Sequence, residues 1–393
     1  MSNAHPVVSL ASLGLPRADM ASAALLATPG LELTYNARGA LLAAFDEIAR
    51  AGRRKVLLPA FHCPSAISPA LMAGLLPVYY RIRPDLSIDT DDVLAKADRD
   101  TAAILLIHYF GFAPAVQALA PLVELGVKTV EDCSHSYVAA DSMQLAGRDE
   151  SDYRVYSFWK IAPSGVGGGL WRRQPGAFPP RRPAPAMARL RNYKRLLEES
   201  TQRTGNPVLQ ALLSGADKLR ASLLSAASAG PAAPQPEPAI ERGESHYPVS
   251  VRLARADMPA HVRRIITAAD LAAIVGARRA NFARYQRSAR HLQPLQALAD
   301  ALPAATCPWV YPVLLEDRSR WDHRLRDAGV ALHTFGIYLH SSLFAAGDRQ
   351  AIEDARFLAA RMLCLSIHQD LSETDIDQNC RVIEATLKTA RPP

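Results

Sequence analysis

The sequence predicts an α/β fold: a large domain with a mostly parallel sheet flanked by helices, followed by a smaller C-terminal α+β domain. The main observation is that short β-rich runs alternate with helix-like stretches between residues 31 and 172. Such alternation favours a domain built around a parallel sheet. The second observation is the length of 393 residues, which is sufficient for two packed domains.

Six β-rich runs predict strands, and three helix-like stretches alternate with them. The first thirty residues carry little pattern and are expected to form an arm or a first helix. The predicted strands are Val56–Pro59, Val78–Ile82, Ala103–His108, Val127–Glu131, Arg154–Phe158 and Gly168–Trp171. The predicted helices are Gly39–Ala51, Ser65–Ala73 and Ala115–Leu125.

The second half of the chain divides into an irregular and a regular part. Residues 175–245 combine a stretch rich in proline and arginine, a basic helix-like segment and the alanine- and proline-rich Ala229–Pro238, which predict a divergent helical or linker region. We therefore expect a large domain over residues 1–245, with its core at 31–172, and a small domain over 246–393. The elements expected in the small domain are a helix at Arg278–Arg290, a strand at Trp309–Leu315, and helices at Arg318–Ala328 and Glu373–Ala390.

The composition excludes several classes of protein. A net charge of +7 is far below the charge density of a dedicated nucleic-acid binder. The five cysteines show no CxxC spacing, so we expect neither disulfides nor a zinc site, and the cytoplasm as location. The apolar runs are too short to span a bilayer, so we expect no membrane partner.

A lysine follows the end of a predicted strand in Tyr156–Lys160, and the glycine-rich Gly165–Gly169 comes next. A partly desolvated lysine at a strand end loses its proton readily and can form a Schiff base with a carbonyl compound. Ser157 precedes Lys160 by three residues and can donate to a phosphate, while glycines let the backbone turn close to a ligand. The pattern suits a pyridoxal-phosphate site. The alternative, an exposed lysine beside a glycine turn, is about equally supported by this segment alone.

An acidic residue ends another predicted strand, in Val127–His135. Asp132 would lie at the carboxyl end of a parallel strand, where α/β proteins place ligands. A pyridoxal enzyme needs such an acid against its pyridinium nitrogen, because the protonated ring withdraws electrons during catalysis. His135 could stack on the ring or bond its phenolic oxygen. The alternative is that Asp132 caps the next helix.

Two further segments suit a cofactor. The amides of Ala37 and Arg38 precede an amphipathic helix, where free N–H groups and the helix dipole favour a phosphate, although an ordinary capped helix is favoured by this segment alone. His62 ends a β-run beside Phe61, as a ring-facing loop or core packing would. His62 and Cys63 have no second ligand pair at suitable spacing, so no metal is expected.

In this order the segments resemble the DegT/StrS-type sugar aminotransferases, which are fold-type-I pyridoxal-phosphate enzymes. The resemblance covers residues from about 31 to 172 and from about 260 to 393, and the ordered set is specific although each piece alone is not. The pieces that carry it are Asn36–Leu42, Leu58–Ser65, His108–Gly111, Val130–Cys133, Ser157–Gly169, Tyr311–Val313, Gly336–His340 and Leu363–His368.

The resemblance implies a homodimer with active sites at the subunit interface. It also implies transfer of an amino group, usually from glutamate, to a keto sugar carried on a nucleotide. Lys160 would bind pyridoxal 5′-phosphate and shuttle a proton, and Asp132 would pair with the ring nitrogen. It further implies that His135 lies near the ring oxygen and that Ser157 and the amides of Ala37 and Arg38 hold the phosphate. Asn192 would reach the phosphate of the cofactor in the partner subunit. Tyr338 and His340 would face the substrate.

The sequence departs from the family at three points. The serine–lysine spacing is three where many members have five, Val166 stands where an acidic residue is common, and residues 175–245 match poorly. Two alternatives therefore stay open. One is a pyridoxal-phosphate enzyme of the same fold with dehydratase-like chemistry; Lys160 counts against it, because sugar dehydratase relatives carry histidine there. The other is a catalytically silent binding relative, which has no need for the lysine, the acid and the phosphate loop together.

Overall fold

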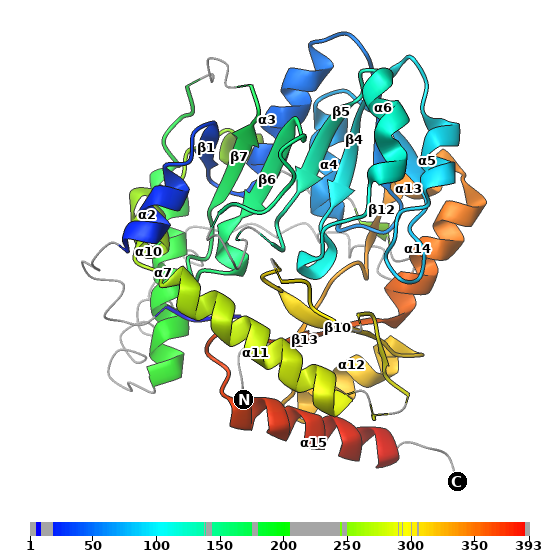
Figure 1. Ribbon diagram of the computed structural model, residues 1–393. Helices are drawn as coiled ribbons and strands as arrows, with labels where there is room; N and C mark the ends of the chain where they lie inside the picture. The colour runs from blue at the N-terminus through cyan, green and yellow to red at the C-terminus, as the bar shows by residue number, and fades with distance from the viewer. Residues whose placement is uncertain are drawn as a thin grey trace, which may run out of the picture.

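A seven-stranded sheet forms the centre of the protein, in the strand order β1-β7-β6-β5-β4-β2-β3 (Figure 1). The computed structural model describes residues 5–8, 19–136, 138, 144–174, 180–204, 244–245, 250–289, 291–292, 294–299, 301–304 and 306–389. Neighbouring strands pair in parallel, except that β7 is antiparallel to both β1 and β6. The strands are β1 (Leu31–Thr34), β2 (Lys55–Pro59), β3 (Leu76–Tyr80), β4 (Thr101–Ile107), β5 (Lys128–Asp132), β6 (Tyr153–Ser157) and β7 (Gly168–Arg172).

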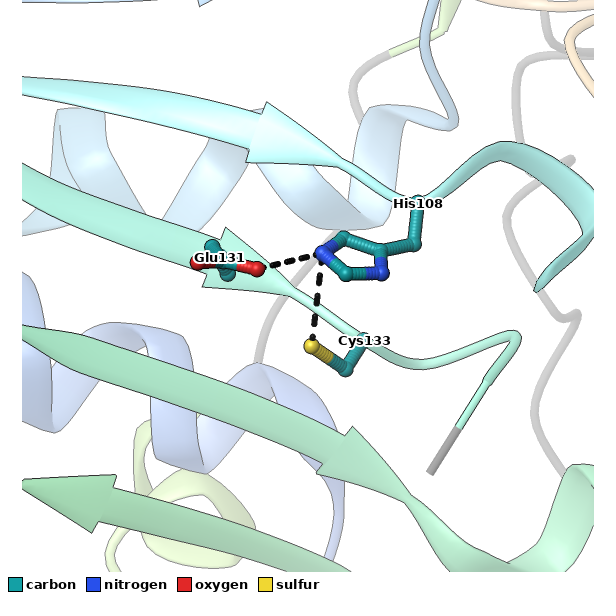
Figure 2. Close-up of side chains that lie close together, drawn as sticks. All are labelled: His108, Glu131 and Cys133. Carbon is teal, nitrogen blue, oxygen red and sulfur yellow. Dashed lines mark hydrogen bonds and ion pairs between the residues drawn. The ribbon is translucent and has the colours of Figure 1, made fainter. Parts of the chain in front are cut away.

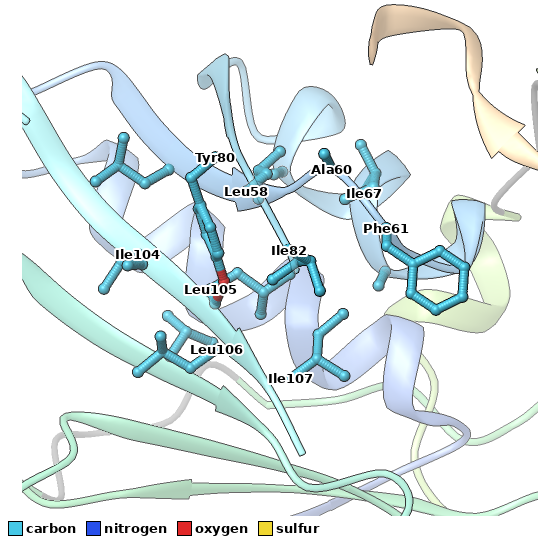
Figure 3. Packing of buried hydrophobic residues seen from close by; sticks show 14 of the residues in the cluster. Leu58, Ala60, Phe61, Ile67, Tyr80, Ile82, Ile104, Leu105, Leu106 and Ile107 are labelled. Atoms are coloured by element: carbon cyan, nitrogen blue, oxygen red, sulfur yellow. Dashed lines mark hydrogen bonds between the residues drawn. The ribbon is translucent and has the colours of Figure 1, made fainter. Parts of the chain in front are cut away.

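The central strands are apolar because both faces of the sheet are covered. Every residue of β4 is buried, as expected for a parallel strand between two layers of helix. Figure 3 shows the side chains of this strand packed against Leu58, Tyr80 and Ile82. The hydroxyl of Tyr80 donates a 2.7 Å hydrogen bond to the carbonyl of Leu105, so the polar atom of this buried ring has a partner.

Helices connect the strands and begin at recognisable caps. The side chain of Asn36 accepts the N–H of Gly39 at the start of α3, and Asp89 accepts the N–H of Asp92 at the start of α5. Helix α4 begins with a proline, whose missing N–H is not needed there. The α-helices of residues 19–204 are α2 (Met20–Leu26), α3 (Ala37–Ala49), α4 (Pro64–Met72), α5 (Thr90–Lys96), α6 (Ala120–Glu124) and α7 (Ala186–Thr204), and the 3-10 helices are η1 (Tyr109–Gly111), η2 (Gln117–Leu119) and η3 (Phe158–Lys160).

A four-stranded antiparallel sheet follows, in the order β11-β13-β10-β9. Its strands are β9 (Gln296–Ala297), β10 (Val310–Leu314), β11 (Leu332–His333) and β13 (Met362–Ser366), and β12 (Leu339–His340) pairs separately with β8 (Glu244–Ser245). Helices α11 and α15 lie side by side against it (Figure 1). The helices here are α9 (Val251–Ala254), α10 (Ala260–Thr267), α11 (Leu271–Ala289), α12 (Arg318–Asp327), α13 (Ser341–Ala346), α14 (Arg349–Arg361) and α15 (Glu373–Thr389).

The predicted α/β class is confirmed, and most predicted elements lie within a few residues of the observed ones. The helix predicted at Ala115–Leu125 is instead a 3-10 turn, η2, followed by the short α6. Helices α5 and α14 were not expected. The linker predicted at Ala229–Pro238 lies outside the described residues, and the division into domains at residue 245 stays a prediction. One buried cluster contains residues from both sides of that boundary, among them Phe61 and Phe335.

Among the helices that the structure describes, none combines the length and the apolar character that crossing a membrane requires.

A substitution at Leu105 tests the packing of this core. Its side chain is fully buried in β4, so Leu105→Ala removes apolar contacts and leaves a cavity. We expect the free energy of unfolding to fall by about 2–5 kcal/mol, measured by urea denaturation. Leu190→Ala is the matched control, because Leu190 is 63% exposed and should cost less than about 1 kcal/mol. Equal losses in both variants would contradict the packing described here.

Candidate active site

The carboxyl ends of the central parallel strands surround a cavity of about 520 Å³. Strand β5 ends at Asp132, and β6 ends at Ser157, directly before the 3-10 turn η3 (Phe158–Lys160). Loops after the strands of an α/β sheet converge at this edge, which is where such folds bind ligands. The predicted site residues that line the cavity are Ala37, Arg38, Asp132, His135, Ser157 and Lys160.

Lys160 is buried beside an aromatic ring and is influenced by the charge of the Asp132 carboxylate. Its Nζ lies 4.5 Å from the centroid of the Trp309 ring. Burial lowers the pKa of the Lys160 amine, because desolvation penalises the charged form, and the Asp132 carboxylate opposes that shift. The lowering prevails, so a larger fraction of the amine is neutral and nucleophilic than in an exposed lysine.

Asp132, at the end of β5, and His135, three residues later, each accept a hydrogen bond from the backbone. The carboxylate of Asp132 accepts the N–H of Ser134 at 2.9 Å. The Nδ1 atom of His135 accepts the backbone N–H of Phe110 at 3.1 Å, which places the ring proton on Nε2. Burial, and then the charge of Lys160, lower the pKa of His135 well below its ordinary value. His135 is therefore a neutral imidazole with a donating Nε2–H.

An aromatic wall fixes the His135 ring. It stacks on Trp309 with 4.3 Å between centroids and meets Phe335 edge-on at 5.2 Å. The backbone N–H of Trp309 donates to the carbonyl of Phe110 at 3.0 Å. Phe110 has a φ of 57°, a left-handed conformation that is uncommon outside glycine and that clusters at ligand sites. One strained residue thus aligns both the histidine and the tryptophan.

The N-terminus of α3 lies next to Ser157. The strand register places Ser157 opposite Gly168, and Gly168 opposite Thr34, just before the helix. A Cβ at Gly168 would come within 2.3 Å of the carbonyl carbon of Asn36, so only glycine permits this approach. The amides of Ala37 and Arg38, the helix dipole and the Ser157 hydroxyl thereby face one region suited to an anion.

The remaining predicted site residues do not line this cavity. His62 is fully buried: its Nδ1 donates to the carbonyl of Pro59 at 2.9 Å, and its Nε2 accepts the N–H of His340 at 2.9 Å. Tyr338 is 41% exposed. Asn192 donates to the carbonyl of Ser164 and accepts from His261 at 2.7 Å. The ligand contacts expected of these four residues stay predictions.

Three potential metal ligands, His108, Glu131 and Cys133, lie close together at the ends of β4 and β5 (Figure 2). Nε2 of His108 is 2.5 Å from Glu131 and 3.7 Å from the Cys133 sulfur. Glu131 also pairs with Arg148 at 3.1 Å and accepts a hydrogen bond from Ser151. The buried carboxylate is thus compensated by cationic and hydrogen-bonding partners, as a structural network requires. This network joins His108, the residue after β4, to Glu131 and Cys133, the two residues that flank Asp132.

Arg278, for which the sequence predicted no role at the site, holds the lysine segment in place. This fully buried guanidinium on α11 donates to the carbonyls of Lys160 at 3.1 Å, Trp309 at 3.1 Å and Pro308 at 3.3 Å. It also donates to the side chain of Gln369 at 3.1 Å. An arginine within a helix that carries several other arginines gives no signal of such a role. Trp309, His5 and His333 also line the site without having been expected there.

As predicted, the chain shares its fold with aminotransferases of known structure. Residues 28–170 match the model of the DegT/DnrJ/EryC1/StrS aminotransferase family. The resemblance predicted from the sequence is therefore confirmed for this segment, which contains both Asp132 and Lys160. A GDP-perosamine synthase of Vibrio cholerae is 30% identical over 118 residues, which are 29% of this chain. The match spans about a third of the length of that relative, 32%.

Solved structures of sugar aminotransferases share the fold over nearly the whole chain. The sugar aminotransferase CalS13 from Micromonospora echinospora superposes with a TM-score of 0.64 at 18% identity, covering 98% of this chain and all of that one. PseC of Helicobacter pylori, an aminotransferase in pseudoaminic acid biosynthesis, gives 0.66 at 15% identity and 99% of both chains. The pyridoxal-phosphate form of Spr1654 from Streptococcus pneumoniae, a putative sugar aminotransferase, gives 0.68 at 13% identity and 100% of both.

Arg278→Ala should destabilise the protein strongly, because several buried carbonyls lose a charged donor together. We expect the free energy of unfolding to fall by about 3 kcal/mol or more, measured by urea denaturation. Arg279→Ala is the control: the neighbouring side chain also donates to two carbonyls, of Pro303 and Thr306, but at the surface. A smaller loss in Arg278→Ala than in Arg279→Ala would refute the anchoring role.

His62 should make stability depend on pH. Burial lowers its pKa to about 3 in the folded chain, against 6.5 for the ordinary value. As pH falls through about 6.5, the unfolded chain takes up a proton that the folded chain excludes, so stability falls with a slope that grows to about 1.4 kcal/mol per pH unit from this residue. Unfolding free energies of wild type and His62→Gln between pH 6.5 and 5 test this; the variant should show a shallower slope. Parallel slopes would contradict the assignment.

Proposed function

We propose that the protein is a pyridoxal-phosphate-dependent aminotransferase that transfers an amino group from glutamate to a nucleotide-linked keto sugar. One observation carries the proposal: Lys160, Asp132 and the N-terminus of α3 line a single cavity at the carboxyl edge of the sheet. The family match of residues 28–170 and the sugar aminotransferases among the similar proteins support it. We propose further that the enzyme acts as a cytoplasmic homodimer.

The residues of the cavity fit pyridoxal phosphate. The amide-rich start of α3 and the Ser157 hydroxyl suit a phosphate dianion. The Asp132 carboxylate suits a protonated pyridine nitrogen, and the buried Lys160 amine suits the aldehyde. When bound, the cofactor supplies a carbonyl that joins covalently to amines and a ring that withdraws electrons from the substrate carbon.

The protein's own part is to hold these groups and to move a proton. The Lys160 amine has a lowered pKa, so it can accept a proton from a substrate carbon and return it at another position. Arg278 fixes the backbone of Lys160 during this movement. The neutral His135 offers a hydrogen bond from Nε2 without adding positive charge beside the lysine. Trp309 and Phe335 line the cavity with apolar surface, which limits the access of water.

Lys160→Ala tests the proposal. Wild-type protein purified with pyridoxal phosphate should retain the cofactor through dialysis and show its visible absorbance band, which glutamate should bleach. Lys160→Ala should lose the covalently retained cofactor, because no amine remains to join its carbonyl. Lys128→Ala, a change at a half-exposed lysine on β5, should behave like the wild type.

Three outcomes bear on the alternatives. An unchanged band in Lys160→Ala would refute the assignment of the lysine. A wild-type band that glutamate leaves unchanged would favour another amino donor or dehydratase-like chemistry. Failure of the wild type to bind the cofactor would favour a binding protein without catalytic activity.

A further inference from the structure

A short N-terminal segment, residues 5–8, reaches the candidate active-site cavity. His5 lines the cavity together with Trp159 and His333. The segment is held by the backbone N–H of Val7, which donates to the Asp370 carboxylate at 2.8 Å. Val8 is 3% exposed and packs in a buried cluster with residues of the helices α7 and α10. These contacts hold His5 at the cavity wall, although it is distant in sequence from the strand ends that form the rest of the site.

The His5 ring contacts other rings, but one of its polar atoms lacks a partner. Its centroid lies 4.4 Å from that of His333, edge-on, and 5.3 Å from that of Trp159. Nδ1 is buried and accepts or donates no hydrogen bond among the described residues. Leaving such an atom unpaired costs about 1–3 kcal/mol, and native structures rarely tolerate it without reason. At a cavity wall the missing partner can come from a ligand.

The electrostatic surroundings decide which kind of ligand group suits His5. Burial, followed by the charge of Arg195, lowers the pKa of His5 to about 4, and Lys160 and Arg278 contribute in the same direction. The ring is therefore uncharged near neutral pH. An uncharged imidazole can accept or donate a single hydrogen bond, which matches a hydroxyl group, whereas a carboxylate is better served by a cation.

We propose that His5 contacts the sugar substrate, with Nδ1 forming a hydrogen bond to a hydroxyl group of the keto sugar. The inference rests on the proposed function and adds a residue that determines affinity for the acceptor. His5 makes no contribution to the binding of the amino donor. The N-terminal segment is thereby a part of the acceptor site.

Two substitutions separate the hydrogen bond from the shape of the ring. His5→Phe keeps an aromatic ring but no polar atom, and His5→Asn keeps a polar group close to the position of Nδ1. With glutamate as donor and GDP-, dTDP- and UDP-linked 4-keto-6-deoxyhexoses as probes, His5→Phe should raise the KM for the accepted sugar roughly tenfold. His5→Asn should restore most of the affinity, and kcat should change less than KM in both.

The donor half of the reaction serves as the internal control. Bleaching of the cofactor band by glutamate should proceed in His5→Phe at the wild-type rate, which also shows that the variant is folded. His323→Phe makes the same change at an exposed histidine on α12 and should leave both half-reactions unchanged.

Two results would overturn the inference while leaving the proposed function intact: an unchanged KM for the sugar in His5→Phe, or an equal loss in the glutamate half-reaction. A wild type that is bleached by glutamate but turns over none of the three probes would instead refute the proposed acceptor class, and the assignment of His5 with it.

Discussion

The in-register pairing of β4, β5 and β6 is the constraint on which the site depends. Ile107 pairs with Asp132, and Asp132 with Val155, so the three strands end at one edge of the sheet. Parallel strands cannot be joined by hairpins, and their connections must return along the faces of the sheet. The residues that follow the strands are therefore brought to the same edge. The position of the Lys160 segment and of Asp132 follows from this geometry before any side chain is considered.

Burial rather than direct ion pairing sets the charge state of the site. Desolvation lowers the pKa of Lys160, His135 and His333, and the opposing carboxylate of Asp132 does not reverse the shift at the lysine. Several neutral imidazoles thus surround one amine. Each neutral imidazole can donate or accept a hydrogen bond without adding positive charge beside the lysine.

The sequence was sufficient to predict six of the seven strands of the large sheet, all but β1, and the residues that end them, because local patterns determine both. The apolar run in β4 and the acidic end of β5 are visible in the residues themselves. Arg278 and His5 were not predictable, because their roles arise from contacts with residues more than a hundred positions away, such as Arg278 with Lys160. The hydrogen bond of His62 with the backbone of His340 was likewise not predictable from the sequence, because it joins two distant segments; the ring contact expected of His62 stays a prediction.

The hydrogen bonds of Arg278 have a consequence for how this fold can be divided. Residues 28–170, which match the family model, contain the lysine and the acid but not the donors that hold the lysine in place. Arg278 and Gln369, both from the second half of the chain, saturate the carbonyls of Lys160 and Ile161. A fragment limited to the matched segment would leave these carbonyls without their donors. The turn that carries Lys160 is thus encoded in one half of the chain and held in place by donors from the other half.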